Sequence, residues 1–192
     1  MCAGNIISEY AVLLPAHCIF RRSSQDWEWG SYRIHAGDYS LVDDSDNQFA
    51  KTYEISSVVK HPGYKGWGFK NDLAIAFTKT KIDFNARIGK ISIPETKIDV
   101  TNPTEALFSA WMYKDDAQVE IVFKTGYMKM FSKNYCLPKF FRGPEPEIFS
   151  KVMPGLCAGT PVSLIVKIVF FQKILNYFLR IWQLSEEVLE VL

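Results

Sequence analysis

Short runs of alternating apolar and polar residues, separated by turn residues, fill the first half of the chain. In "SYRIHAG" the apolar Tyr32, Ile34 and Ala36 alternate with polar neighbours, and "NIISEYAVLL" is a short run with β-branched and aromatic residues. "DLAIAF" is almost continuously apolar, as in strands buried on both faces. Short strands at this spacing, with Gly, Pro, Asn and Asp between them, predict an all-β barrel or sandwich rather than βαβ units.

The pattern changes twice in the second half of the chain. "PETKIDVTNPT", residues 94–104, is polar with two prolines and predicts a linker, after which strand-like runs resume in "ALFSAWMY" and "AQVEIVFK". Residues 161–192 contain no glycine and no turn signal, and their composition is typical of an apolar helix. We therefore expect three parts: residues 1–97, residues 98–160 and an apolar, helical tail over residues 161–192.

Composition and charge exclude some classes of protein. The 192 residues include 22 basic and 21 acidic side chains, for a net charge of +1, which argues against a nucleic-acid-binding surface. The even number of cysteines, 4, suggests two disulfides and an oxidising compartment. Residues 1–20 lack the basic start and long apolar core of a signal peptide, so the export signal of a secreted protein would have to lie upstream.

The stretch "CAGNIISEYAVLLPAHC" contains the first candidate site residue. It resembles the segment around the catalytic histidine of chymotrypsin-like (trypsin-fold) serine proteases, in which two cysteines form a disulfide beside that histidine. Cys2 and Cys18 match the two cysteines in order and spacing, and His17 matches the histidine. Leu14-Pro15 stands where Thr-Ala is usual in the family.

Further motifs of the same family follow in the same order. "HPGY" and "KNDLAIAF" resemble the family's His-Pro-x-Tyr turn and its Asn-Asp-Ile-Ala-Leu strand, so that Asp72 matches the catalytic aspartate. "SAWM" around Trp111 resembles a degraded Ser-Gly-Trp-Gly. Cys136 and Cys157, the latter in "MPGLCAG", resemble the family's bridged pair before the nucleophile loop. The resemblance covers residues 1–159.

This resemblance implies two perpendicular β-barrels of a serine endopeptidase, the first over residues 1–97 and the second, over residues 98–160, incomplete. It also implies that His17 is a general base, that Asp72 orients it, and that the substrate is a polypeptide. A secreted protein without a cofactor is expected. The alternatives from the residues alone are a hydrogen-bonded structural histidine and an aspartate that caps a turn. We expect no metal site, because the nearby Cys2, His17 and Cys18 lack a CxxC or HxxxH spacing.

The family's nucleophile is missing from the sequence. Its Gly-Asp-Ser-Gly-Gly-Pro motif lies about a dozen residues after the cysteine that Cys157 matches, where this chain reads "CAGTPVSLIVKIVFFQ", with Phe170 near the serine position. Ser163 and Ser185, the only serines in the tail, have no glycine neighbours. The family's Ile-Val-Gly-Gly start is also absent before Met1. The sequence thus predicts a chain truncated at both ends and catalytically incompetent, with no residues from which P1 specificity follows.

Residues 161–192 allow several interpretations. A narrow polar stripe on an apolar helix is typical of a membrane-surface or partner-binding helix, whereas Lys167, Lys173 and Arg180 argue against a membrane span. We favour translated non-coding sequence, because the composition changes abruptly after "CAG". The alternative functions are therefore a non-catalytic protease homologue that binds a protein partner, and a protein associated weakly with a membrane through its tail.

Overall fold

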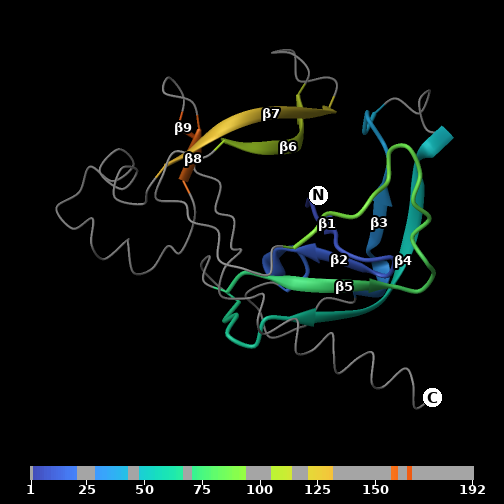
Figure 1. Cartoon of the computed structure of the whole chain (residues 1–192). Helices are drawn as coiled ribbons and strands as arrows, with labels where there is room; N and C mark the ends of the chain where they lie inside the picture. The colour runs from blue at the N-terminus through green and yellow to red at the C-terminus, as the bar shows by residue number, and fades with distance from the viewer. Residues whose placement is uncertain are drawn as a thin grey trace.

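The computed structural model describes residues 2–20, 29–42, 48–66, 71–93, 105–113, 121–131, 157–159 and 164–165. Within these residues the chain folds into two antiparallel sheets and two short 3₁₀ helices, η1 (Ala16–Cys18) and η2 (Trp29–Ser31) (Figure 1). The first sheet has the order β1-β2-β5-β4-β3, and its strands are β1 (Asn5–Ile6), β2 (Ala11–Leu14), β3 (Arg33–Ala36), β4 (Lys51–Lys60) and β5 (Ala74–Thr78).

Two of the expected strands are present where their patterns predicted them. Exposed and more buried side chains alternate along β3, which ends at the buried Ala36. The last four residues of the apolar run "DLAIAF" lie in β5, the central strand of the sheet, which pairs with β2 on one side and β4 on the other. A central strand is covered by side chains on both faces, which accounts for its continuous apolar run.

The run "NIISEYAVLL" forms a hairpin rather than one strand. β1 pairs with β2, with Ile6 opposite Val12, and the turn between them is held by the backbone N–H of Ile7, which donates to the carbonyl of Ala11 at 2.9 Å. The Ser8 hydroxyl accepts the backbone N–H of Tyr10 at 3.2 Å. This serine-based turn contains neither of the usual punctuating residues, Gly or Pro, so the apolar pattern did not reveal it.

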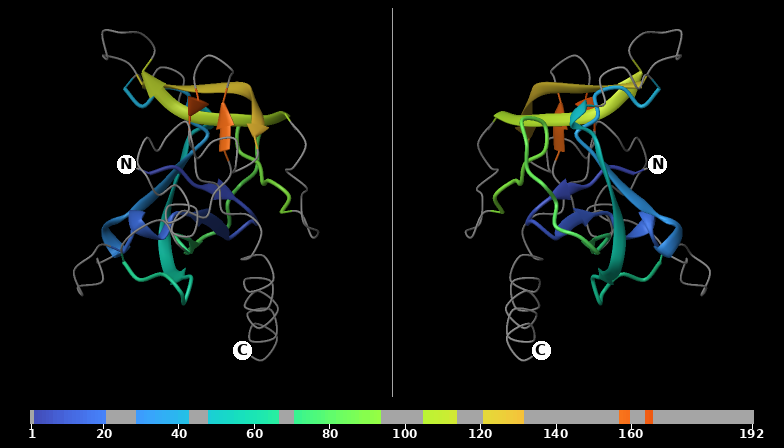
Figure 2. Two further views of the ribbon diagram at one scale, coloured as in Figure 1. Left: turned by 90° about the vertical axis from the view of Figure 1, so that its left-hand side faces the viewer. Right: turned by 90° about the vertical axis from the view of Figure 1, so that its right-hand side faces the viewer.

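The second sheet has the order β6-β7-β8-β9, with strands β6 (Glu105–Tyr113), β7 (Ile121–Phe131), β8 (Cys157–Gly159) and β9 (Leu164–Ile165). The two sheets are connected by a bridge between Ser40 and Val122. On either side of it the Leu41 N–H donates to the Ile121 carbonyl at 2.9 Å, and the Phe123 N–H donates to the Tyr39 carbonyl at 2.8 Å. The side views in Figure 2 place β6 and β7 across one end of the first sheet.

The expected linker, residues 94–104, lies outside the described residues. The helix expected over residues 161–192 can be compared with the structure only at Leu164–Ile165, which pair with β8 and form a strand there. The backbone of these residues finds partners in the edge of the second sheet, which helical periodicity could not indicate. Within the described residues, no helix has the length and apolar character needed to cross a membrane.

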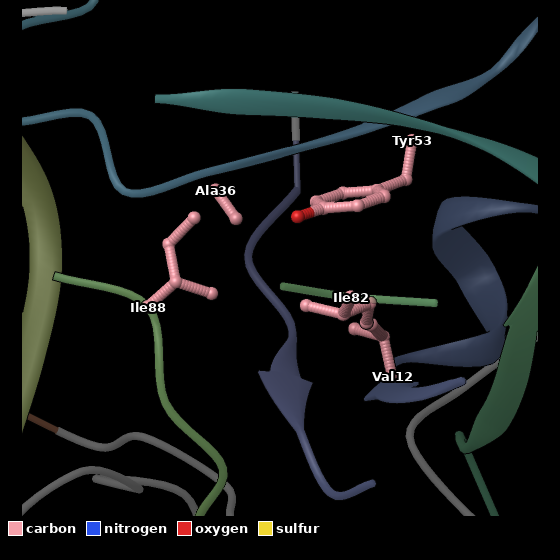
Figure 3. Packing of buried hydrophobic residues seen from close by; sticks show 5 residues of the cluster. All are labelled: Val12, Ala36, Tyr53, Ile82 and Ile88. Carbon is pink, nitrogen blue, oxygen red and sulfur yellow. The ribbon is translucent and has the colours of Figure 1, made fainter. Parts of the chain in front are cut away.

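A compact apolar cluster holds the first sheet together. It contains Val12 of β2, Ala36 of β3, Tyr53 of β4, and Ile82 and Ile88 from the segment after β5 (Figure 3). Gly37 lies next to this cluster, and two features require glycine there. Its φ of +82° is a left-handed conformation, and a Cβ would lie 2.7 Å from Ile88 Cγ1. The cluster fixes β2 against β3 and β4, and therefore fixes the segment that leaves the end of β2.

Candidate active site

His17 and Asp72 are brought together by the pairing of β2 with β5. Leu14, the last residue of β2, lies opposite Ala74, the first residue of β5. Because the strands are antiparallel, the segment that follows β2 and the segment that precedes β5 lie at the same end of the sheet. Pro15 is extended and leads into η1, whose Ala16 is completely buried, and this anchors His17 beside Asp72.

The Asp72 carboxylate contacts both the ring and the backbone of His17. His17 Nδ1 lies 2.6 Å from Asp72 Oδ2, and the His17 backbone N–H donates to Asp72 Oδ1 at 2.8 Å. The Asp72 side chain is 5% exposed and the His17 side chain 53% exposed. The contact expected from the family resemblance is therefore present, with the carboxylate buried behind a half-exposed imidazole.

This arrangement determines how the imidazole can act. An ionised carboxylate only accepts hydrogen bonds, so in the neutral imidazole Nδ1 carries the proton and Nε2 keeps its lone pair. A half-exposed Nε2 can take a proton from a hydroxyl group brought to it, and the carboxylate stabilises the imidazolium that forms. The geometry is that of a general base with an orienting partner; the catalytic role of both residues stays a prediction.

Asn71 supports this pair and was given no role by the sequence analysis. It adopts φ 57°, a left-handed conformation that asparagine tolerates better than most residues. Its Nδ2 donates to the Gly63 carbonyl at 3.0 Å and so connects the segment before β5 to the turn of residues 61–64. A Cβ at Gly63 would lie 2.5 Å from Asn71 Nδ2, so this contact requires glycine. The available signal was the motif "HPGY" followed by Asn-Asp.

The other two histidines have structural partners elsewhere. His61 Nδ1 accepts the Gly63 N–H at 3.0 Å, as expected for a turn residue, and burial lowers the pKa of His61 from its ordinary value of 6.5. His35, on β3, contacts the Thr52 hydroxyl at 2.9 Å and Asp38 at 2.8 Å. β3 is the edge strand of the sheet opposite β1, so this second histidine–aspartate pair belongs to a different part of the fold.

The disulfide expected between Cys2 and Cys18 is present, and it joins the segment before β1 to η1. It links residues 16 positions apart in the sequence, directly beside His17. Cys136 lies outside the described residues, and only the backbone of Cys157 is described, in β8. The pairing of Cys136 with Cys157 therefore stays a prediction.

Replacing both Cys2 and Cys18 with serine should lower the free energy of unfolding by about 3 kcal/mol, because an open loop of this length gains entropy in the unfolded chain. Urea unfolding of the oxidised wild type and the double variant measures the difference. The same comparison in a reducing buffer is the control, since both chains then lack the bond and should unfold alike. A double variant as stable as the oxidised wild type would contradict the prediction.

Three possible metal-ligating side chains also meet at this point. The ligand atoms of Cys2, His17 and Cys18 all lie within 4.8 Å of one another. The spacing of these residues matches no metal-binding motif, so no metal site was expected from the sequence. With the two sulfurs bonded to each other, neither is a thiolate, so the oxidised chain offers a metal only the imidazole.

Comparison with known proteins places these features in one family. The family model described as Trypsin matches residues 1–160. Serine protease 1 of Rattus norvegicus is 26% identical over 111 residues, which are 57% of this chain and 39% of the rat protein. Anionic trypsin of Canis lupus familiaris is 28% identical with the same coverage, and a venom serine protease of Polistes dominula is 25% identical over 48% of this chain and 32% of its own length. The match thus spans less than half of each relative.

A solved structure shows the same architecture. Neuropsin, described as a serine protease expressed in the limbic system of mouse brain, superposes with a TM-score of 0.61 at 18% identity, covering 83% of this chain and 64% of that one. At this identity the likeness concerns the fold. It confirms the all-β, chymotrypsin-like double-barrel class that the motifs implied.

Proposed function

Because the chain belongs to the trypsin family, we propose that His17 and Asp72 are its general base and orienting carboxylate, and that the chain supplies no serine nucleophile. The single observation that carries the first part is the bidentate contact of the buried Asp72 with the ring and backbone of His17, at 2.6 and 2.8 Å. One buried carboxylate holds both the ring and the backbone of His17, as the orienting partner of a general base does.

The second part is supported by the sequence after β8. Residues 160–192 contain two serines, Ser163 and Ser185, and neither is flanked by the glycines that a tight nucleophile turn requires. No Gly-Asp-Ser-Gly-Gly motif occurs in the 192 residues. Loss of a triad serine typically reduces the rate by about six orders of magnitude, and the residual activity depends on an oxyanion hole whose glycine is missing here as well.

The remaining elements of the proposal follow from the family. The chain would bind a polypeptide next to His17 without hydrolysing it. It would do so in an extracellular compartment, in which the Cys2–Cys18 disulfide persists. The three-part division at residues 97 and 160 is also a proposal, and membrane association through residues 161–192 concerns a segment of which only Leu164–Ile165 are described.

Treatment of the full chain with a serine-directed fluorophosphonate should give no covalent adduct, before or after limited cleavage with trypsin. Intact-mass measurement detects the adduct, and dog anionic trypsin is the positive control. A stoichiometric adduct that disappears in a Ser163→Ala or Ser185→Ala variant would overturn the absence of a nucleophile and identify the serine. It would leave the assignment of His17 and Asp72 untouched, because that assignment depends on their own contact.

A further inference from the structure

We propose that reduction of the Cys2–Cys18 disulfide turns the region beside His17 into a zinc site with three protein ligands. The ligands are Cys2 Sγ, Cys18 Sγ and His17 Nε2. Thiolate and imidazole are the donors that Zn²⁺ prefers, and three of them leave a fourth position for water or for a donor from a bound molecule. This proposal does not depend on a catalytic role for His17.

One of the three donor–donor distances already matches a tetrahedral metal site. His17 Nε2 lies 3.8 Å from Cys18 Sγ, and all three ligand atoms lie within 4.8 Å of one another. With the usual Zn–S and Zn–N bond lengths, neighbouring donors in a tetrahedron are about 3.5–3.8 Å apart. The two sulfurs are too close, at 2.02 Å, and breaking their bond lets them separate and lets Cys2 Sγ adjust its distance from His17.

The chemical steps balance with a reductant of the dithiol or phosphine class. It transfers two electrons to the sulfur–sulfur bond, the two sulfurs take up two protons as thiols, and the dithiol becomes a disulfide or the phosphine, with water, its oxide. Zn²⁺ then displaces the two thiol protons, which leave to solvent. Cys2 is exposed and Cys18 partly exposed, so a reductant can reach the bond.

The fold should keep the three ligands together after the bond is broken. Pairing of Asn5 with Leu13 holds the chain three residues beyond Cys2. Gly4 packs so closely on β2 that a Cβ there would lie 2.8 Å from Val12 Cγ1. On the other side, the Cys18 N–H donates to the Pro15 carbonyl at 3.1 Å within η1. Both cysteines are thus close in sequence to backbone that strand pairing, packing or hydrogen bonds hold in addition to the disulfide.

Asp72 supplies the outer partner that metal-bound histidines usually have. Its contact with His17 Nδ1, at 2.6 Å, leaves Nε2 as the ring atom available to a metal and orients the ring. The same nitrogen would accept a proton in the proposed base function. A bound zinc ion and proton transfer by His17 therefore exclude each other, and the redox state of one disulfide would select between them.

The test uses the full chain, reduced with a phosphine that is then removed under anaerobic conditions. Zn²⁺ affinity is measured by competition with a chromophoric chelator, and Co²⁺ substitution reports thiolate ligation by its charge-transfer absorption. We expect the reduced chain to bind zinc and the oxidised chain to bind it at least tenfold more weakly. The Cys2→Ser and His17→Gln variants should each lose at least tenfold in affinity, and Asp72→Asn about 10–100-fold.

His35→Gln is the matched control, because it removes an imidazole paired with an aspartate elsewhere in the sheet, and it should bind zinc as the wild type does. Equal zinc affinity in the reduced wild type, Cys2→Ser and His17→Gln would overturn the proposal and assign the metal to other thiols. If reduction unfolds the chain, added zinc should refold the wild type but not His17→Gln, as monitored by circular dichroism. A reduced wild type that stays unfolded with zinc present would overturn it as well.

Discussion

Replacing Asp72 with asparagine is expected to move the proton of the neutral His17 imidazole from Nδ1 to Nε2. The His17 backbone N–H, 2.8 Å from Asp72 Oδ1, is always a donor, so the asparagine must turn its oxygen toward it. Its NH₂ group then faces Nδ1, at the position where Oδ2 now lies 2.6 Å away. Two donors cannot share this contact, and the imidazole must take the other tautomer.

The tautomer is measured directly by ¹⁵N–¹H correlation of the imidazole at a pH at which the ring is neutral. Wild type should show a protonated Nδ1, and Asp72→Asn an unprotonated one. The free energy of unfolding should fall by about 1.5–3 kcal/mol, the usual worth of a hydrogen bond to a charged group. Asp38→Asn, which changes the partner of His35, is the control and should leave the His17 spectrum unchanged. An unaltered tautomer in Asp72→Asn would remove the orienting role assigned to Asp72.

The sequence was most informative where a local motif and a tertiary contact coincide. The stretch from Cys2 to Cys18 contains two cysteines and the histidine beside the second, and its resemblance to the family's histidine segment predicted the disulfide that the structure shows. Asp72 is 55 positions from His17, and it was found only because its own strand motif resembles the family's. Neither periodicity nor composition would have paired the two.

Contacts without a local signal could not be predicted. The bridge between Ser40 and Val122 joins the two sheets through backbone atoms. Backbone atoms are the same in every residue, so the sequence does not indicate which residues they pair with. The left-handed Asn71 depends on the turn that it contacts. No metal site was expected at Cys2, His17 and Cys18, because their spacing matches no metal-binding motif. The structure brings their ligand atoms within 4.8 Å of one another, and a metal there stays a proposal.

The substitution Ile82→Ala should lower the free energy of unfolding by about 2–5 kcal/mol, because it combines lost apolar burial with a cavity that the surroundings only partly fill. Ile82 is 0% exposed and packs in the cluster with Val12 of β2, Tyr53 of β4 and Ile88 (Figure 3). Its backbone N–H donates to the Glu9 carbonyl at 2.7 Å, and alanine keeps that bond, so the loss measures the side chain.

Ile91→Ala is the matched control: the same atoms are removed from a side chain that is 41% exposed. Partial burial loses less transfer free energy, and solvent fills the space, so we expect a cost of about 1 kcal/mol or less. Urea unfolding measures the free energy of unfolding of both variants, which can be compared when that free energy depends on urea concentration with the same slope.

A cavity at Ile82 should also loosen η1, because Val12, which contacts the same cluster, lies two residues before the end of β2. The loosening would appear as faster amide hydrogen exchange at Ile19 and Phe20, whose N–H groups donate to the Ala16 carbonyl. Equal costs at positions 82 and 91 would mean that this cluster is not what holds β2, and with it His17, in place.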